Sequence, residues 1–142
     1  MELSLDNPPT VAAPFADRFA HVARLDLDGG ALLMLSGQIA VDEAGDVVAP
    51  GDAGAQAELI FDTIGRLLAA HGATFADVLH IRVYLTDFDD LPAYAAARGK
   101  RFPAGGAGLP PASTALQVSR LLLPGLVIEL EVTAAVARPA AG

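Results

Sequence analysis

The chain has 142 residues, no cysteine and a formal net charge of −8 at pH 7. Its length suits one domain with its own hydrophobic core, and the lack of cysteine excludes disulfides, thiolate nucleophiles and thiolate metal ligands. The negative charge repels nucleic-acid phosphates, and no Lys/Arg cluster offsets it, so nucleic acid is not an expected partner.

The two ends of the chain differ in composition from the rest. Residues 1–14 are rich in proline and lack periodicity, which predicts a flexible N-terminal arm before a single domain over residues 15–138 and a short tail over 139–142. The N-terminal segment is acidic where a signal peptide is basic, and no apolar run approaches the ~20 residues that span a bilayer. We therefore expect a cytoplasmic protein with no membrane partner.

The first half of the domain predicts two strands followed by a helix. His21 to Leu27 alternates weakly, and Gly29-Gly30 is a turn signal before the wholly apolar run Ala31 to Leu35, which is typical of a strand buried on both faces. After a turn-like segment, apolar residues recur at helical spacing until Gly72 supplies a stop. They are Ala57, Ile60, Phe61, Ile64, Leu67 and Leu68.

The second half predicts a strand, a helix and two more strands. Val78 to Leu85 alternates in the manner of a strand, and an Ala-rich helix is expected from about Leu91 to Arg101. A Pro/Gly-rich loop then leads to strands over roughly Ser113 to Leu121 and Leu126 to Ala137. The order β-β-α-β-α-β-β predicts an α+β domain with two helices on one face of a sheet.

The last strand carries two carboxylates. Alternation places Leu126, Ile128, Leu130 and Val132 on one face, and it places Glu129 and Glu131 on the other. An unpaired carboxylate in a dry environment costs several kcal/mol or has a raised pKa. Glu129 and Glu131 must therefore be solvated, paired with a cation, or active in acid/base chemistry.

Three motifs in a fixed order resemble the Rid/YjgF family of reactive intermediate deaminases. They are Ser36-Gly37-Gln38 after an apolar strand, Pro111-Ala112 before a strand, and Ile128-Glu129-Leu130-Glu131. The resemblance runs from about Phe19 to Val136. It implies a chorismate mutase-like fold and a homotrimer with inward-facing sheets and a small-molecule ligand in each intersubunit cleft. Small, neutral side chains assigned to the uncovered sheet face also favour burial by neighbouring subunits: Ala115, Gln117 and Ser119.

The resemblance implies a role for several residues. Glu129 matches the carboxylate that helps place the attacking water, with pairing to Arg82 or Arg120 as the structural alternative, whereas Glu131 is expected to be a pairing residue. The binding candidates are Phe19, Ser36, Gly37, Gln38 and Phe102. The alternatives are a plain strand end for residues 36–38 and a core position for Phe102.

One position departs from the family pattern. Ser113 stands where deaminating members have an arginine that grips the substrate carboxylate in two hydrogen bonds. Losing that contact would cost on the order of 3 kcal/mol of carboxylate binding. Ala95 stands where many members have asparagine. Arg98 either supplies a substitute cation or is a solvated helix residue.

Three functions remain open at this point. The first is an enzyme for an imine or enamine other than the standard 2-imino acids, with Glu129 as acid/base. The second is a non-catalytic trimeric small-molecule-binding protein, and the third, disfavoured by the acidic charge, is an endoribonuclease or translation inhibitor. The spacing of His21, His71 and His80 suits no metal motif, so neither metal nor cofactor is expected.

Overall fold

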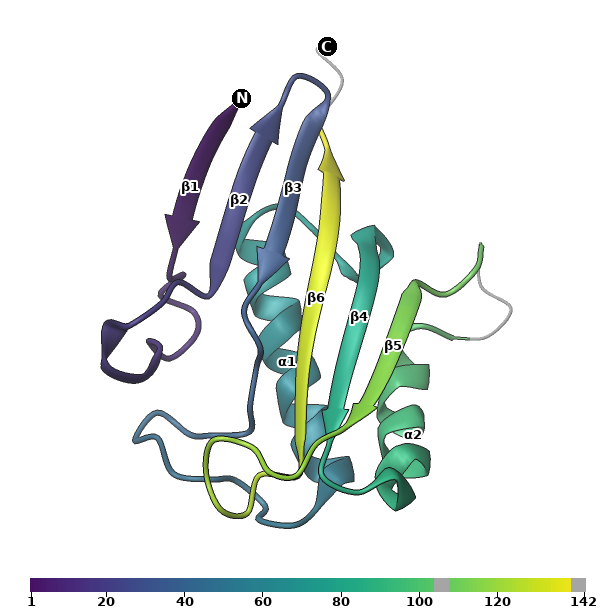
Figure 1. Ribbon diagram of the computed structural model, residues 1–142. Helices are drawn as coiled ribbons and strands as arrows, with labels where there is room; N and C mark the ends of the chain where they lie inside the picture. The colour runs from purple at the N-terminus through teal and green to yellow at the C-terminus, as the bar shows by residue number, and fades with distance from the viewer. Residues whose placement is uncertain (104–107, 139–142) are drawn as a thin grey trace.

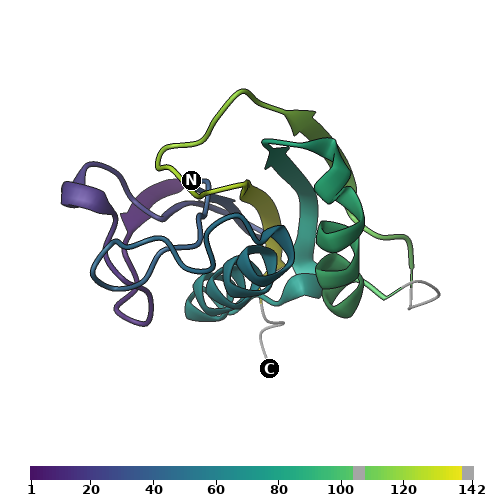
Figure 2. The ribbon, with the colours of Figure 1, turned by 90° about the horizontal axis from the view of Figure 1, so that it is seen from below.

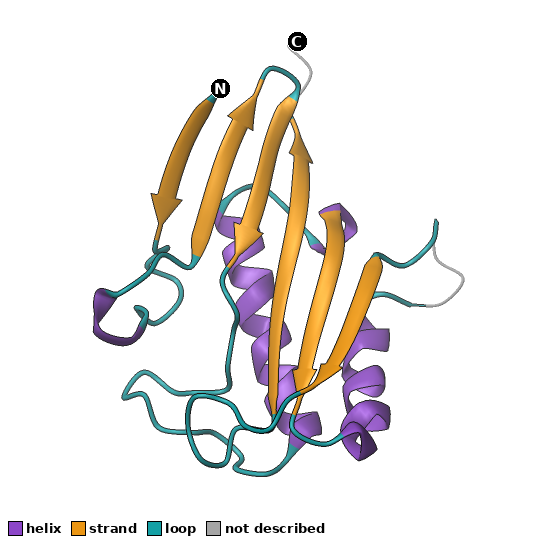
Figure 3. Ribbon diagram, viewed as in Figure 1, coloured by secondary structure: helices purple, strands orange, loops and turns teal. Residues whose placement is uncertain are grey.

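The computed structural model describes residues 1–103 and 108–138 and shows one sheet backed by two long helices (Figures 1 and 3). The predicted tail over residues 139–142 lies outside these ranges. The strands are β1 (Glu2–Asp6), β2 (Val22–Leu27), β3 (Gly30–Leu35), β4 (Val78–Leu85), β5 (Ala112–Gln117) and β6 (Ile128–Ala137). The helices are α1 (Ala53–Ala70) and α2 (Leu91–Arg101), with short 3-10 turns at Phe15–Asp17, Phe75–Asp77 and Phe88–Asp90.

The strand order across the sheet is β1-β2-β3-β6-β4-β5 (Figure 1). Neighbouring strands are antiparallel except β4 and β5, which run parallel. Parallel neighbours need a crossover connection, and α2 provides it. Both long helices lie on the same side of the sheet (Figure 2). The predicted α+β architecture with helices on one face is confirmed.

The helices begin and end where local signals indicate. The side chain of Asp52 accepts a hydrogen bond from the backbone N–H of Ala55 and so caps α1, and Gly72 follows that helix with φ of +74°. The apolar stripe of α1 is buried as predicted, and Phe61 stacks on Tyr94 of α2. Helix α2 has its predicted bounds. No helix in the described ranges is long and apolar enough to cross a bilayer.

The N-terminal segment contains a strand that the sequence did not predict. In place of a loose arm throughout, Glu2–Asp6 pair with β2 along the sheet edge. Asp6 Oδ2 lies 3.1 Å from His71 Nε2, beyond the end of α1. Residues 2–6 are too few for alternation to identify a strand, so this strand forms because it pairs with β2.

The two faces of β3 differ within one chain. Leu33 and Leu35 are buried, but Met34 is 56% exposed, so the prediction of a strand buried on both faces is wrong for the single chain. Alternation puts Met34 on the sheet face opposite the helices, which we name the open face. On β1–β3 this face is apolar, with Leu3, Leu5, Leu25, Leu27, Leu32 and Met34.

The prediction that Ala115 and Gln117 lie on the uncovered sheet face is also wrong. The register pairs Ala115 with Val83 and Gln117 with Leu85, whose side chains are buried on the helix side. Strand β5 ends at Gln117, so Ser119 lies beyond it. These three residues therefore do not form the open face.

Candidate functional site

Glu129 lies on β6 between Ile128 and Leu130, both of which are fully buried on the helix side. Alternation therefore directs its carboxylate to the open face. There it meets Gly37, which follows β3: a β-carbon built on Gly37 would lie 2.0 Å from Glu129 Oε1. The glycine leaves the space that the carboxylate occupies.

The segment that carries Gly37 is fixed by hydrogen bonds on both sides. The backbone N–H of Gln38 donates to the Leu130 carbonyl at 2.7 Å, and the Leu130 N–H donates back at 3.1 Å. The buried Gln38 side chain donates to the Ser36 carbonyl and contacts His21 Nδ1, while Ser36 Oγ donates to the Ala20 carbonyl. Ser36 and Gln38 therefore hold the segment in place, which leaves Gly37 as the residue in contact with Glu129.

Phe19 borders the same segment. The residue is 47% exposed, and its ring lies edge-on to the His21 ring at a centroid distance of 6.2 Å. The His21 carbonyl in turn accepts from the Ser36 N–H at 2.9 Å. We name Phe19, residues 36–38 and Glu129 the first residue set.

The charge on Glu129 has no partner in the described part of the chain. No hydrogen bond or ion pair involves its carboxylate there, and burial, followed by the charge of Glu131, raises the pKa of Glu129. The predicted alternative of pairing with Arg82 is wrong, because Arg82 Nη1 binds Glu131 Oε1 at 3.3 Å. The Tyr84 hydroxyl donates to the same Glu131 oxygen at 2.5 Å, so Glu131 is the paired residue, as expected. Sequence alone gave no signal for Tyr84, because the contact spans two strands.

The remaining candidates come from α2, its C-terminal end and β5, and we name Arg98, Phe102 and Ser113 the second residue set. Phe102 packs edge-on against Phe75 at 5.6 Å, and the Arg98 guanidinium lies over its ring at 5.6 Å. Phe102 thus makes the core contacts that its alternative interpretation, a core position, predicts. Arg98 is half-buried, and its Nε atom is enclosed with no hydrogen-bond partner in the described ranges. Arg98 is therefore partly buried against Phe102, and neither its role as a substitute cation nor the solvated alternative is decided by these contacts.

Ser113 and Glu129 lie on opposite sides of the sheet. Ser113 is exposed on β5 and pairs with Ile81, a buried residue of the helix side, and β4 separates β5 from β6. One chain does not bring the two residue sets together.

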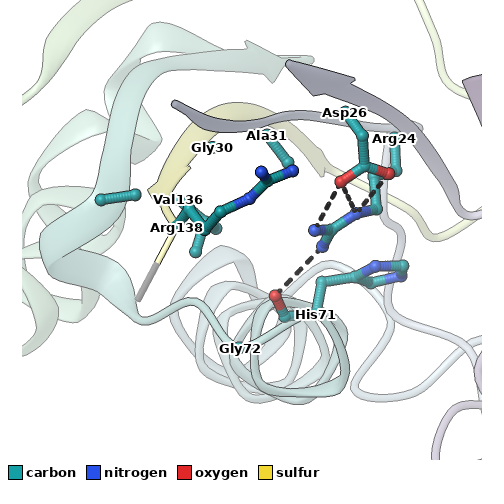
Figure 4. A pocket seen from close by; sticks show the side chains of 9 residues that line it. Arg24, Asp26, Gly30, Ala31, His71, Gly72, Val136 and Arg138 are labelled. Carbon is teal, nitrogen blue, oxygen red and sulfur yellow. Dashed lines mark hydrogen bonds and ion pairs between the residues drawn. The ribbon is translucent and has the colours of Figure 1, made fainter. Parts of the chain in front are cut away.

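A separate hollow of about 320 Å³ lies between the end of α1 and the ends of β2, β3 and β6 (Figure 4). Two of its charged groups, Arg24 and Asp26, are paired: Arg24 donates to Asp26 at 2.9 to 3.2 Å and to the His71 carbonyl at 3.3 Å. The bond from Arg24 lowers the pKa of Asp26. These contacts tie β2 to α1, so we assign the hollow a structural role.

Metal-ligating side chains are dispersed in the parts of the chain that the structure describes. No group of three or more His, Asp or Glu side chains is placed there to hold a metal ion.

Comparison with known proteins gives consistent matches. The family model described as Endoribonuclease L-PSP matches residues 12–136. Protein DfrA from Myxococcus xanthus is 33% identical over 116 residues, which cover 82% of this chain and 81% of that protein. The 3-aminoacrylate deaminase RutC from Acinetobacter baylyi is 33% identical over 99 residues, 70% of this chain and 75% of that one.

A solved structure shares the fold. The Rid-family protein YyfA from Yersinia pestis superposes with a TM-score of 0.80, covering 95% of this chain and all of that one at 21% identity. At this identity the likeness concerns the fold alone.

Proposed function

Because the chain belongs to the Rid/YjgF family, we propose that it hydrolyses a small reactive imine or enamine, with Glu129 as the acid/base residue. The observation that carries the proposal is the Glu129 carboxylate, half-buried and without a partner in the described ranges, held against Gly37. A carboxylate whose pKa is raised by burial exchanges protons nearer to neutral pH than an exposed one does.

The proposed reaction adds water across a C=N bond. Glu129 accepts a proton from water as the water oxygen bonds to the imine carbon, and the nitrogen takes up a proton to give a carbinolamine. The C–N bond then breaks as Glu129 carries the hydroxyl proton to the nitrogen, so that a carbonyl forms and ammonia leaves. An enamine would first be protonated at carbon and lose a proton from nitrogen, which gives the imine. The relative RutC is named a deaminase of 3-aminoacrylate, which supports this reaction class.

We further propose a homotrimer with a ligand cleft between subunits. Two observations support this assembly. The first and second residue sets lie on opposite sides of the sheet, so a cleft that uses both needs two chains. The open face also exposes Leu3, Leu5 and Met34 at 67%, 69% and 56%, an apolar surface that a neighbouring subunit would cover. Sedimentation equilibrium should return three times the 14.5 kDa chain mass, and a monomer at micromolar concentration would contradict the assembly.

A second candidate function is ligand binding without turnover. The side chains of Ser36 and Gln38 bond to backbone carbonyls of this chain. Glu129 is then the one polar side chain of the first residue set left to contact a ligand, and a single carboxylate can bind a ligand without converting it. An endoribonuclease is the least supported function, because the net charge of −8 disfavours a phosphate backbone.

The test is ammonia release from a panel of imines generated in situ, by an amino-acid oxidase for those with a carboxylate and by an amine oxidase for those without one, together with enamines. Glu129→Gln keeps the shape of the side chain but removes its proton-accepting charge, so turnover should fall by about 10²-fold or more. Glu131→Gln is the matched control on the same strand and should reduce maximal turnover less. Unchanged turnover in Glu129→Gln would exclude the acid/base role, and a protein that binds panel members without converting any would favour the binding function.

A further inference from the structure

The two carboxylates on the open face of β6 have unequal surroundings. Glu131 Oε1 accepts from Arg82 and from the Tyr84 hydroxyl, both on the neighbouring strand β4. Glu129 stands opposite Tyr84 in the strand register, yet the hydroxyl reaches past it to Glu131. Both donors on β4 therefore bind Glu131, and neither binds Glu129.

The surroundings of Glu129 offer few other charges. The segment packed over it from β3 presents Gly37, which has no side chain. From β4 it faces Tyr84, with Arg82 two residues further along and engaged by Glu131. On its own strand the neighbouring charge is Glu131, two residues away on the same face.

We propose that Glu131 is a positioning residue that favours the protonated form of Glu129, because Arg82 and Tyr84 hold its carboxylate on the same sheet face, two residues away. The hydrogen bonds from Arg82 and Tyr84 fix the position of the Glu131 carboxylate on the open face of β6. A like charge two residues away on the same face disfavours ionisation of Glu129, which has no donor of its own in the described ranges. The raised pKa of Glu129, caused by burial first and by Glu131 second, agrees with this arrangement.

The role given to Glu131 rests on the proposed function, but the titration that tests it does not depend on that function. A general acid/base works best when its pKa is near the working pH. Glu131 would thus bring Glu129 toward that range without contacting the substrate.

The chain has five glutamates, at positions 2, 43, 58, 129 and 131, so carboxyl-carbon NMR of protein labelled at the glutamate side chain gives a spectrum that Glu→Gln variants can assign. The apparent pKa of Glu129 should fall by about half a unit or more in Glu131→Gln, because a like charge is removed. Glu131→Asp keeps the charge and should restore most of the wild-type value. Glu58→Gln, on α1, is the control and should leave the titration of Glu129 unchanged.

An unchanged Glu129 titration in Glu131→Gln would overturn the proposal. If Glu131→Gln does not fold, Glu131→Asp still tests it, because loss of the raised pKa in that charge-preserving variant would contradict a role for charge. The titration needs no substrate, so its outcome is independent of whether the protein deaminates anything. Where turnover is measurable, the acid limb of the pH profile should move to lower pH in Glu131→Gln.

Discussion

Glu129 Oε1 occupies the position where a side chain at residue 37 would begin, 2.0 Å from the β-carbon that Gly37 lacks. The contact joins the segment after β3 to the middle of β6, more than ninety residues apart in sequence. Gly37 therefore leaves space for the Glu129 carboxylate but has no side chain that could bind it.

Gly37→Ala should displace the Glu129 carboxylate. A heavy-atom separation of 2.0 Å is impossible, but the far end of a glutamate can rotate away at little cost to folding. We expect turnover to fall about as far as in Glu129→Gln, with a melting temperature within a few degrees of wild type. Gly99→Ala is the control, because Gly99 lies on the exposed side of α2 with nothing near its added β-carbon. That change should stabilise the protein by about 0.5 to 1 kcal/mol and leave turnover unchanged. Full activity in Gly37→Ala would show that the position of the carboxylate is unimportant.

Glu129→Gln should stabilise the protein at neutral pH. Burial raises the pKa of Glu129 in the folded state, so folding favours its protonated form, and that contribution is present at low pH and lost as the pH rises through the folded pKa. Urea unfolding should give the variant a higher midpoint than wild type at pH 7 and a similar one near pH 4. A lower midpoint at pH 7 would mean that Glu129 is held by a stabilising ion pair.

Ser113→Arg should increase activity on imines that carry a carboxylate. Wild type lacks the arginine at this position, so 2-iminopropionate should be a poor substrate, about a hundredfold below what a bidentate contact would allow. Ser113 is exposed on β5 in the single chain, so a longer side chain there does not displace the core. The measurement is kcat/KM for imines with and without a carboxylate in both proteins. Wild-type deamination of 2-iminopropionate that Ser113→Arg does not improve would show that another cation, such as Arg98, already binds the carboxylate.

Arg101→Met should destabilise the contact between the two helices. Arg101 is 14% exposed, binds Glu58 and Asp62 of α1, and lies over the Phe61 ring at 5.2 Å. Its loss should lower the free energy of unfolding by about 1 to 2 kcal/mol. Lys100→Met removes a second partner of Glu58, but Lys100 is 66% exposed, so that loss should stay below about 0.5 kcal/mol. Equal losses in chemical denaturation would show that Arg101 contributes no more than a surface ion pair.

Local patterns determined the helices and the central strands. The stripe on α1, the alternation in β4 and the alternating Leu126–Val132 run in and before β6 each report a buried face through residues close in sequence. The same alternation directed Glu129 away from the core and indicated that its charge needed an explanation.

Tertiary structure decided which charges and faces meet. The Arg82–Glu131 and Gly37–Glu129 contacts depend on strand register, and the placement of Ala115 on the helix side depends on β5 running parallel to β4. Strand β1 likewise exists through its pairing with β2. Sequence patterns report which face of a single element is buried, whereas pairing between distant strands is set by the packing of the whole sheet. The sequence therefore determined that the Glu129 side chain points away from the core. Only the tertiary structure decided that Glu131 has a partner and Glu129 has none in the described ranges.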